Sequence, residues 1–387
     1  MSDNEYSVSV VSLSAEFANL HDPWNELLRS SHRKSICLTW DWLHTWWEVY
    51  GEDGMRLHII VVRLGDIPVG IAPFWIQTAK RAGLIPIRTL RFLGTGEPDA
   101  VAVVSEYLDI IARPEHTDEV VRQVCKYLGE HRIWDRMVLC DVLKDALVLT
   151  CLRDDMFGRG VPSFTYDKGV RYAVELPGTW AQYASTLDPG AARRVSYKRR
   201  KFERAGRVLK HVISRGDELD RAFEDLARLH AARWHAKGMP GVFESVLFKR
   251  FHRALAAHLL PLGSLNLMFV SLDDIPVAAL YNFRWENVEY FYQGGIDIER
   301  AGKYSPGTVI HAYAIESAIQ NGIVRYDMMR GHAGSYKIEF GCTKTSMFDM
   351  HLFGRTLIGR TLYFAVLARN RLRDGWRNRV GPVQAAP

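Results

Sequence analysis

Residues 57–75 read LHIIVVRLGDIPVGIAPFW, and residues 265–283 read LNLMFVSLDDIPVAALYNF. Aligned without gaps, the two segments are identical at seven of nineteen positions, including a shared Asp-Ile-Pro-Val run. Each segment has an apolar run, a Gly-Asp or Asp-Asp turn and a second apolar run, which predicts a β-hairpin. Pro68 and Pro276 lack an N–H group, so each suits the first residue of the returning strand or an edge position.

The sequence around the two segments repeats as well. Apolar periodicity predicts two helices before each hairpin, and more strands and a helix after it. The repetition predicts a duplicated α/β (α+β) domain. Gly169, Pro177 and Gly178 interrupt the periodicity near 165–178, which gives domains at 1–172 and 173–355 and a tail helix at 356–387. The predicted helices are 14–30, 40–51 and 114–129 in the first half, and 219–236, 244–260 and 307–321 in the second.

The composition is that of an ordinary globular protein. Of its 387 residues, 48% are hydrophobic and 24% are charged. The five cysteines form no CxxC pair, so we expect neither a zinc site nor a disulfide framework, and no metal. The N-terminus lacks a secretory signal, and no stretch reaches the roughly 20 apolar residues of a membrane span. We therefore expect a cytoplasmic protein.

Positive charge is concentrated in two places. The run 193–210 contains nine basic residues and one acidic residue, and the net charge of the chain is +6. We expect a basic helix there, with Arg193 and Lys198 binding the acceptor, donor phosphates or RNA. The tail at 356–387 reads as a basic amphipathic helix. It either packs on the second domain with a solvated basic face, or lies on anionic lipid at the inner membrane face.

A candidate binding site follows the second hairpin, within 289–341. An aromatic strand leads to a glycine-rich loop, a basic turn and then Ser305-Pro306-Gly307-Thr308, which starts a helix. Free N–H groups at a helix start, next to cations, bind anions. The predicted cofactor-binding residues are Arg300, Gly302, Lys303, Ser305, Gly307 and Thr308, with Asp297 in the loop as a substrate-binding residue.

A second group of candidates lies near the end of this segment. Asp327 stands in an otherwise apolar strand, where a carboxylate is costly unless it is paired or used in chemistry. Arg330 is the expected partner. The two interpretations, a structural ion pair and a catalytic or substrate-orienting carboxylate, remain open at this stage.

The chain resembles the GNAT-like acyltransferases of the CelD/BioF2-like group, associated with cellulose and exopolysaccharide biosynthesis and related to the FemABX peptidyltransferases. The resemblance rests on RRVSYKRRKFERAG, LARLHAARWHAKG, GGIDIERAGKYSPGTVIHAYAIESAIQNG and YDMMRGHAGSYKIEFG in the second half, and on LTWDWLHTWWEVYG, VGIAPFW, RFLGTGEPD and EYLDIIARPE in the first. It implies tandem GNAT domains, each with a mixed, mainly antiparallel sheet flanked by helices, and transfer from acyl-CoA. In such a domain the helix start receives the coenzyme A pyrophosphate. The signature positions carried over are Asp327, Arg330, Gly331, Tyr336 and Lys337.

Acyl transfer needs a base for the acceptor and an acid for the leaving thiolate. Asp327 suits the base, with His332 as a second candidate. Tyr304 or Tyr336 suits the acid, and Lys337 suits an acidic group of the acceptor. We expect a small-molecule or glycan acceptor from the cell envelope. The alternatives are aminoacyl-tRNA-dependent transfer, the one case in which a nucleic acid is expected, and a non-catalytic accessory protein at the membrane.

Overall fold

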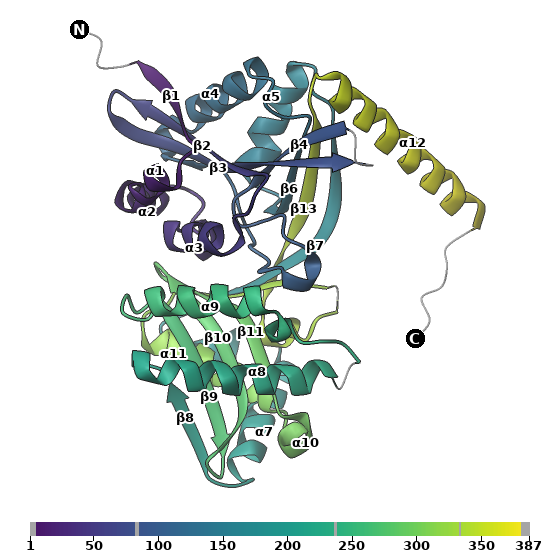
Figure 1. The fold of residues 1–387 in the computed structure, drawn as a ribbon. Helices are drawn as coiled ribbons and strands as arrows, with labels where there is room; N and C mark the ends of the chain where they lie inside the picture. Colours follow the sequence, from purple (N-terminus) through teal and green to yellow (C-terminus); the bar gives the residue numbers. More distant parts are fainter. Residues whose placement is uncertain (1–4, 82–84, 236–237, 333, 381–387) are drawn as a thin grey trace.

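The computed structural model describes residues 5–81, 85–235, 238–332 and 334–380, with side chains to residue 372. Their strands form one mixed sheet of thirteen, in the order β1-β2-β3-β4-β6-β13-β7-β12-β11-β10-β9-β8, with β5 paired to β3. Helices cover the sheet, and the N-terminal and C-terminal halves of the chain form two lobes along it (Figure 1). The predicted α/β class and the tandem arrangement are confirmed.

The two echoed segments form equivalent hairpins, β2–β3 and β9–β10. Both pairings shift register next to the shared proline. Pro68 lies opposite Arg63, and Pro276 lies opposite Ser271, with a bulge directly after each. A bulge accommodates a residue that cannot donate to the ladder. The duplication therefore extends to the register of the strands.

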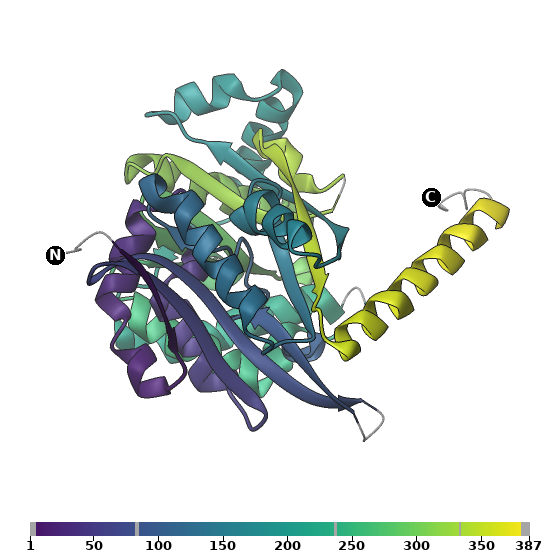
Figure 2. The same ribbon diagram turned by 90° about the horizontal axis from the view of Figure 1, so that it is seen from above.

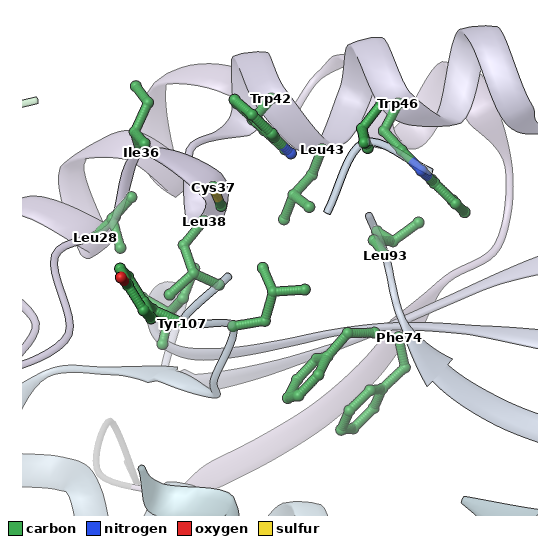
Figure 3. Packing of buried hydrophobic residues seen from close by; sticks show 14 of the residues in the cluster. Leu28, Ile36, Cys37, Leu38, Trp42, Leu43, Trp46, Phe74, Leu93 and Tyr107 are labelled. Atoms are coloured by element: carbon green, nitrogen blue, oxygen red, sulfur yellow. The ribbon is translucent and has the colours of Figure 1, made fainter. Parts of the chain in front are cut away.

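The first lobe packs its helices around a core rich in tryptophan. Trp42 and Trp46 of α3 are fully buried in the cluster that Figure 3 shows, and the Trp46 ring lies 5.8 Å from that of Trp75 in β3. Cys37 lies in the same core, where burial raises the pKa of its thiol. The strands are β1 (Tyr6–Val11), β2 (Met55–Leu64), β3 (Ile67–Arg81), β4 (Ile85–Phe92), β5 (Ile111–Ala112), β6 (Arg136–Leu143) and β7 (Ser163–Glu175), and the helices are α1 (Ser14–Ala18), α2 (His21–Ser30), α3 (Trp40–Tyr50), α4 (Thr117–Glu130) and α5 (Arg153–Gly158).

The second lobe repeats the order of helices, hairpin, strand and helix. Its α11 is buried along most of its length, and α8 and α9 cover the hairpin region in Figure 1. The strands are β8 (Val208–Val212), β9 (Leu265–Leu272), β10 (Ile275–Trp285), β11 (Val288–Ile296) and β12 (Arg325–Gly331), and the helices are α6 (Trp180–Thr186), α7 (Pro189–Glu203), α8 (Leu219–His235), α9 (Val246–Leu259), α10 (Ile298–Ala301) and α11 (Pro306–Gln320). The last strand and helix of the chain, β13 (Thr343–Phe353) and α12 (Leu357–Val380), return to the first lobe.

Two strands join the lobes close to the predicted domain boundary. The boundary at 172/173 falls inside β7, which pairs with β13 over 163–173 and with β12 over 170–175. β13, expected in the second domain, is inserted between β6 and β7 and completes the sheet of the first lobe. The apolar periodicity is interrupted near the predicted boundary, but β7 continues across that boundary without a break.

The basic segments also differ in detail from the expectation. The run 193–210 is not one helix: α7 ends at Glu203, and β8 starts at Val208. The tail helix α12 packs through Leu362 and its neighbours against Ile87 and Phe353, and Asn370 Nδ2 lies 3.5 Å from Tyr166 Oη. The rest of α12 extends away from the body of the protein (Figure 2). Residues 381–387 of the predicted tail lie outside the described residues.

Candidate active site

A cavity of about 320 Å³ opens in the second lobe where β11 and β12 separate. These strands pair in parallel over only three residues of β11, Val288–Tyr290. Beyond Tyr290, β11 continues to Ile296 while its other edge stays paired to β10. The cavity is therefore bordered by the part of β11 that extends past its pairing with β12.

The cavity has an apolar floor and a polar rim. Leu280, Phe291 and Ile310 contribute to the floor, and each is at least nine-tenths buried. The rim carries two cations and one carboxylate among its described lining residues. The polar and charged side chains at the cavity are Lys198, Arg233, Ser305, Thr308, His311, Tyr336 and Glu339.

The N-terminus of α11 faces this cavity without a side-chain cap. Ser305 occupies the N-cap position in the left-handed region, with φ of 55°, and its side chain makes no capping hydrogen bond. This differs from the predicted cap. Lys198 of α7 lies beside the helix start, where its Nζ is 3.2 Å from Thr308 Oγ1 and 3.1 Å from Glu339 Oε2. The first turn of the helix and a cation thus converge on the cavity.

Gly307 leaves room at the entrance. A Cβ atom at this position would lie 2.6 Å from Ile296 Cδ1, so a side chain there would displace the cavity wall. Gly302 also lines the cavity, but a Cβ there would meet Ile298 Cγ2 at 3.2 Å, a milder contact.

His311 and Tyr336 form a hydrogen-bonded pair at the cavity. His311 Nε2 lies 3.2 Å from Tyr336 Oη, and His311 Nδ1 lies 3.2 Å from Tyr326 Oη. Burial lowers the pKa of His311 to about 3, so the ring is neutral at physiological pH. Burial raises the pKa of Tyr336 to about 12, with the positive charge of Arg233 acting in the opposite direction. The cavity therefore holds a protonated phenol next to a neutral imidazole.

The comparisons with known proteins concern the fold. The acetyltransferase (GNAT) domain family matches residues 189–337, which include α11, Tyr336 and the other described lining residues of the cavity except Glu339. The chain has a GNAT acyltransferase fold. A solved structure of FemX superposes with a TM-score of 0.60 at 11% identity, covering 89% of this chain and 96% of FemX. No curated protein matches the sequence significantly.

Two further GNAT-fold similarities involve lysylphosphatidylglycerol synthetases. L-PGS from Bacillus licheniformis has a TM-score of 0.52 at 9% identity, with 89% of this chain and 95% of that chain covered. The C-terminal domain of a putative lysylphosphatidylglycerol synthetase from Agrobacterium fabrum has a TM-score of 0.51 at 8% identity, with coverage of 92% and 97%. At these identities the likeness concerns the fold.

Asp327 lies outside the cavity and is fully buried. Its predicted partner was Arg330, but the ion pair is with Arg171 of β7, whose Nε is 2.6 Å from Oδ2. Oδ1 accepts hydrogen bonds from Tyr107 Oη at 3.2 Å and from the Met329 N–H at 2.7 Å. Both carboxylate oxygens are thus occupied, and Asp327 lies on the face of β12 opposite to that of Tyr326. A carboxylate paired in this way does not suit the role of base predicted for Asp327. The ion pair corresponds to the structural interpretation of this residue.

Arg330 and Lys337 are engaged within the protein rather than at the cavity. Arg330 forms an ion pair with Asp141, and its backbone N–H is 2.9 Å from Glu106 Oε2, so both contacts reach into the first lobe. Lys337 is buried, and its ammonium group donates to the carbonyl oxygens of Met328 and Arg330. These contacts hold the bulged end of β12, and neither residue is among the described lining residues of the cavity.

The remaining predicted residues separate into two groups. Gly302, Ser305, Gly307, Thr308, Lys198 and Tyr336 line the cavity, whereas Arg193, Asp297, Arg300, Lys303, Tyr304 and His332 are not among its lining residues. Asp297 caps α10 by accepting the Arg300 N–H at 2.9 Å, which is a structural role. The ammonium groups of Lys201 and Lys303 lie 5.9 and 5.0 Å from the centre of the Tyr304 ring.

Sequence reasoning missed three polar groups that line the cavity, Arg233, His311 and Glu339. Glu339 is the one carboxylate among the described lining residues, and Arg233 comes from α8, far away in the sequence. His311 lies on the buried side of α11, where a histidine within an apolar helix gave no signal.

Proposed function

We propose that this protein is an acyltransferase that binds an acyl thioester, acyl-CoA, in the β11–β12 cavity. The acyl group would pass to an amine or hydroxyl of a sugar or another cell-envelope or exopolysaccharide precursor, as in the CelD/BioF2-like group. The observation that carries the proposal is the cavity itself, which lies beside an uncapped helix start and holds Tyr336 at its rim.

The donor side of the proposal follows from the shape and charge of this cavity. An extended chain with amide groups can pair with the part of β11 beyond Tyr290, by addition to an open strand edge. Phosphate groups would lie at the first turn of α11 beside Lys198, where N–H groups and a cation favour anions. The apolar floor suits the acyl chain.

The reacting groups would be Glu339 and Tyr336. Glu339 is placed to accept a proton from the attacking amine or hydroxyl, and Lys198 holds it 3.1 Å away. The phenol of Tyr336 keeps its proton at neutral pH and can donate it toward the leaving sulfur. The bond between the acyl carbon and sulfur breaks, and the new bond forms between that carbon and the acceptor.

Transfer from an aminoacyl-tRNA is a second candidate. The support is the exposed basic surface of α7, with Arg193, Arg194 and Arg200, next to the cavity residue Lys198. An aminoacyl ester would then occupy the position proposed for the thioester. This mode predicts RNA binding whose affinity falls steeply as salt concentration rises.

Thermal unfolding with acetyl-CoA and longer acyl-CoAs tests the first candidate. A donor that binds the native state at 100 times its Kd raises stability by about 2.7 kcal/mol. Arg200→Gln, on the exposed face of α7, is a matched control for Lys198→Gln: the Lys198 variant should need more acyl-CoA for the same shift. No shift at millimolar donor would reject the acyl-CoA proposal, and salt-sensitive RNA binding would then favour the second candidate.

We also propose that α12 contacts an anionic membrane surface. Leu357, Phe364 and Leu372 are 83%, 63% and 76% exposed, and they share the outer face of the helix with Arg360 and Arg371. An apolar stripe flanked by arginines suits the headgroup region of a bilayer. Within the described residues, no helix has the length and hydropathy to cross one.

A second cavity beneath α12 supports the same partner. It has a volume of about 460 Å³ and lies between the helix and strands β4, β6 and β13. Lys80, Arg136 and Arg369 line it together with apolar walls, and no acidic residue is among its described lining residues. Cations above an apolar wall suit a lipid phosphate and the first part of its acyl chain.

Sedimentation with vesicles tests this contact. Binding to phosphatidylglycerol vesicles, but not to phosphatidylcholine vesicles, is expected, and Phe364→Ser should reduce it. Phe157→Ser is the matched control, because Phe157 is 72% exposed on α5. Equal binding of the two variants, or no binding by the unaltered chain, would reject the proposed contact.

A further inference from the structure

We infer that His311 is a positioning residue that directs the hydroxyl proton of Tyr336 into the cavity, and that a buried chain of hydrogen bonds starting at Glu289 determines this direction. The inference deepens the proposed function, on which the use of that proton rests. The direction of the hydrogen bonds follows from the structure alone.

The chain begins at a group that can only accept hydrogen bonds. Glu289 of β11 is fully buried, and Arg284 Nε donates to its Oε2 at 2.9 Å. Its Oε1 accepts from Asn266 Nδ2 at 2.7 Å and from Asn282 Nδ2 at 2.8 Å. A carboxylate paired with a guanidinium has no proton to give, so each amide must turn its nitrogen toward Glu289. The orientation of Asn282 is thereby decided.

The orientation of Asn282 determines which way the hydrogen bond to Tyr326 runs. The second N–H of Asn282 points to Tyr326 Oη at 3.2 Å, so the phenol oxygen accepts there. Tyr326 is fully buried, and a buried hydroxyl needs an acceptor for its own proton. Its other hydrogen-bond contact within the described residues is His311 Nδ1, at 3.2 Å. Tyr326 therefore donates to His311, and Nδ1 carries no proton.

A neutral imidazole has one N–H group, so the proton of His311 is on Nε2. Burial keeps the ring neutral by lowering its pKa to about 3. Nε2 then donates to Tyr336 Oη at 3.2 Å, and the phenol oxygen acts as an acceptor. The guanidinium of Arg233, which can only donate, acts on the same oxygen. The proton of Tyr336 is left for a partner in the cavity that both residues line.

The consequence for the reaction is that the O–H group of Tyr336 already points into the cavity before the ligand binds. If His311 carried its proton on Nδ1, Tyr336 would donate to His311 and present a lone pair to the cavity. A lone pair would repel a developing thiolate, whereas an O–H group stabilises it. The tautomer of His311 thus decides what Tyr336 offers to the sulfur atom.

The ¹⁵N NMR signals of the histidine rings test the inference without any ligand. In the full chain with ¹⁵N-labelled histidine, His311 is expected as the neutral Nε2–H tautomer at pH 8 and at pH 6. Its signal is identified by its loss in His311→Gln. A proton on Nδ1, or a doubly protonated ring at pH 6, would overturn the inference. Because no donor is present, this result is independent of whether the protein binds acyl-CoA.

Turnover measurements separate positioning from folding. Gln keeps a donor near the position of Nε2, whereas Phe removes it, so His311→Gln should retain more kcat than His311→Phe. The loss in the Phe variant is expected to be about 10²-fold, with little change in the acyl-CoA-dependent thermal shift. Equal kcat in both variants per folded molecule would contradict the positioning role.

His252 offers a matched control. It is also fully buried, and its two ring nitrogens lie 3.3 Å from Tyr281 Oη and 3.2 Å from Tyr292 Oη, but it does not line the cavity. His252→Gln should lower stability and leave kcat per folded molecule unchanged. If acyl-CoA gives no thermal shift while His311 has the expected tautomer, the proposed function fails and the hydrogen-bond direction stands.

Discussion

Replacing Asp327 by Asn separates a structural carboxylate from a catalytic one. The substitution leaves Arg171, of which 15% of the side chain is exposed, without its ionic partner. Breaking a buried ion pair by removing one partner costs about 3–5 kcal/mol. The amide oxygen of Asn can still accept from Tyr107 and Met329, so most of the cost comes from the uncompensated guanidinium. Urea unfolding of Asp327→Asn should therefore show a loss of about 3–5 kcal/mol.

The same two strands supply the control. Arg325, two residues before Asp327 on β12, forms an ion pair with Glu175 of β7. The side chains of this pair are 39% and 65% exposed. Glu175→Gln should cost no more than about 1 kcal/mol. A double variant, Asp327→Asn with Arg171→Gln, should recover part of the loss because no charge remains unpaired. If Asp327→Asn unfolded like the unaltered protein yet lost all turnover, the reasoning would be refuted and a catalytic role restored.

Three further predictions concern the cavity. Gly307→Val should abolish the acyl-CoA thermal shift by filling the space beside Ile296. Gly216→Val, where an added Cβ meets no atom within 4 Å, should leave the shift unchanged. Equal shifts in the two variants would count against the cavity as the donor site. Tyr336→Phe should keep donor binding and lower kcat by about 10²-fold or more, and unchanged turnover would remove this residue from the reaction. Burial lowers the pKa of His311 in the folded protein to about 3, so the neutral ring costs stability as pH falls from about 6.5 toward 3. Over this range the free energy of unfolding of His311→Gln should fall by up to about 1.4 kcal/mol per pH unit less than that of the unaltered protein. Parallel pH profiles of the two unfolding free energies would contradict this.

Much of the fold could be predicted because it is encoded locally. The Asp-Ile-Pro-Val repeat marks both hairpins, and even the bulges next to Pro68 and Pro276 agree. The pairing of β13 with β6 could not be predicted, since it joins segments far apart in the chain and apolar alternation does not reveal which strand pairs with which.

The candidate site was predictable in part. The helix start at Ser305-Pro306-Gly307 has a composition that indicates an anion site, and it does line the cavity. The partner of Asp327 was misjudged because proximity in the sequence favoured Arg330, whereas antiparallel pairing brings Arg171 of β7 alongside. Glu339 looked like any charged residue of a loop. Only the tertiary structure shows that it faces Lys198.

The placement of β13 also constrains how the chain is made. Met347 pairs with Leu143, about 200 residues earlier, so the first lobe cannot close its sheet until the chain through Phe353 has left the ribosome. Until then the nascent chain exposes the edges of β6 and β7, which invite association with other chains. Slow release of the C-terminus, or premature termination before residue 343, would therefore leave an aggregation-prone first lobe rather than a stable fragment.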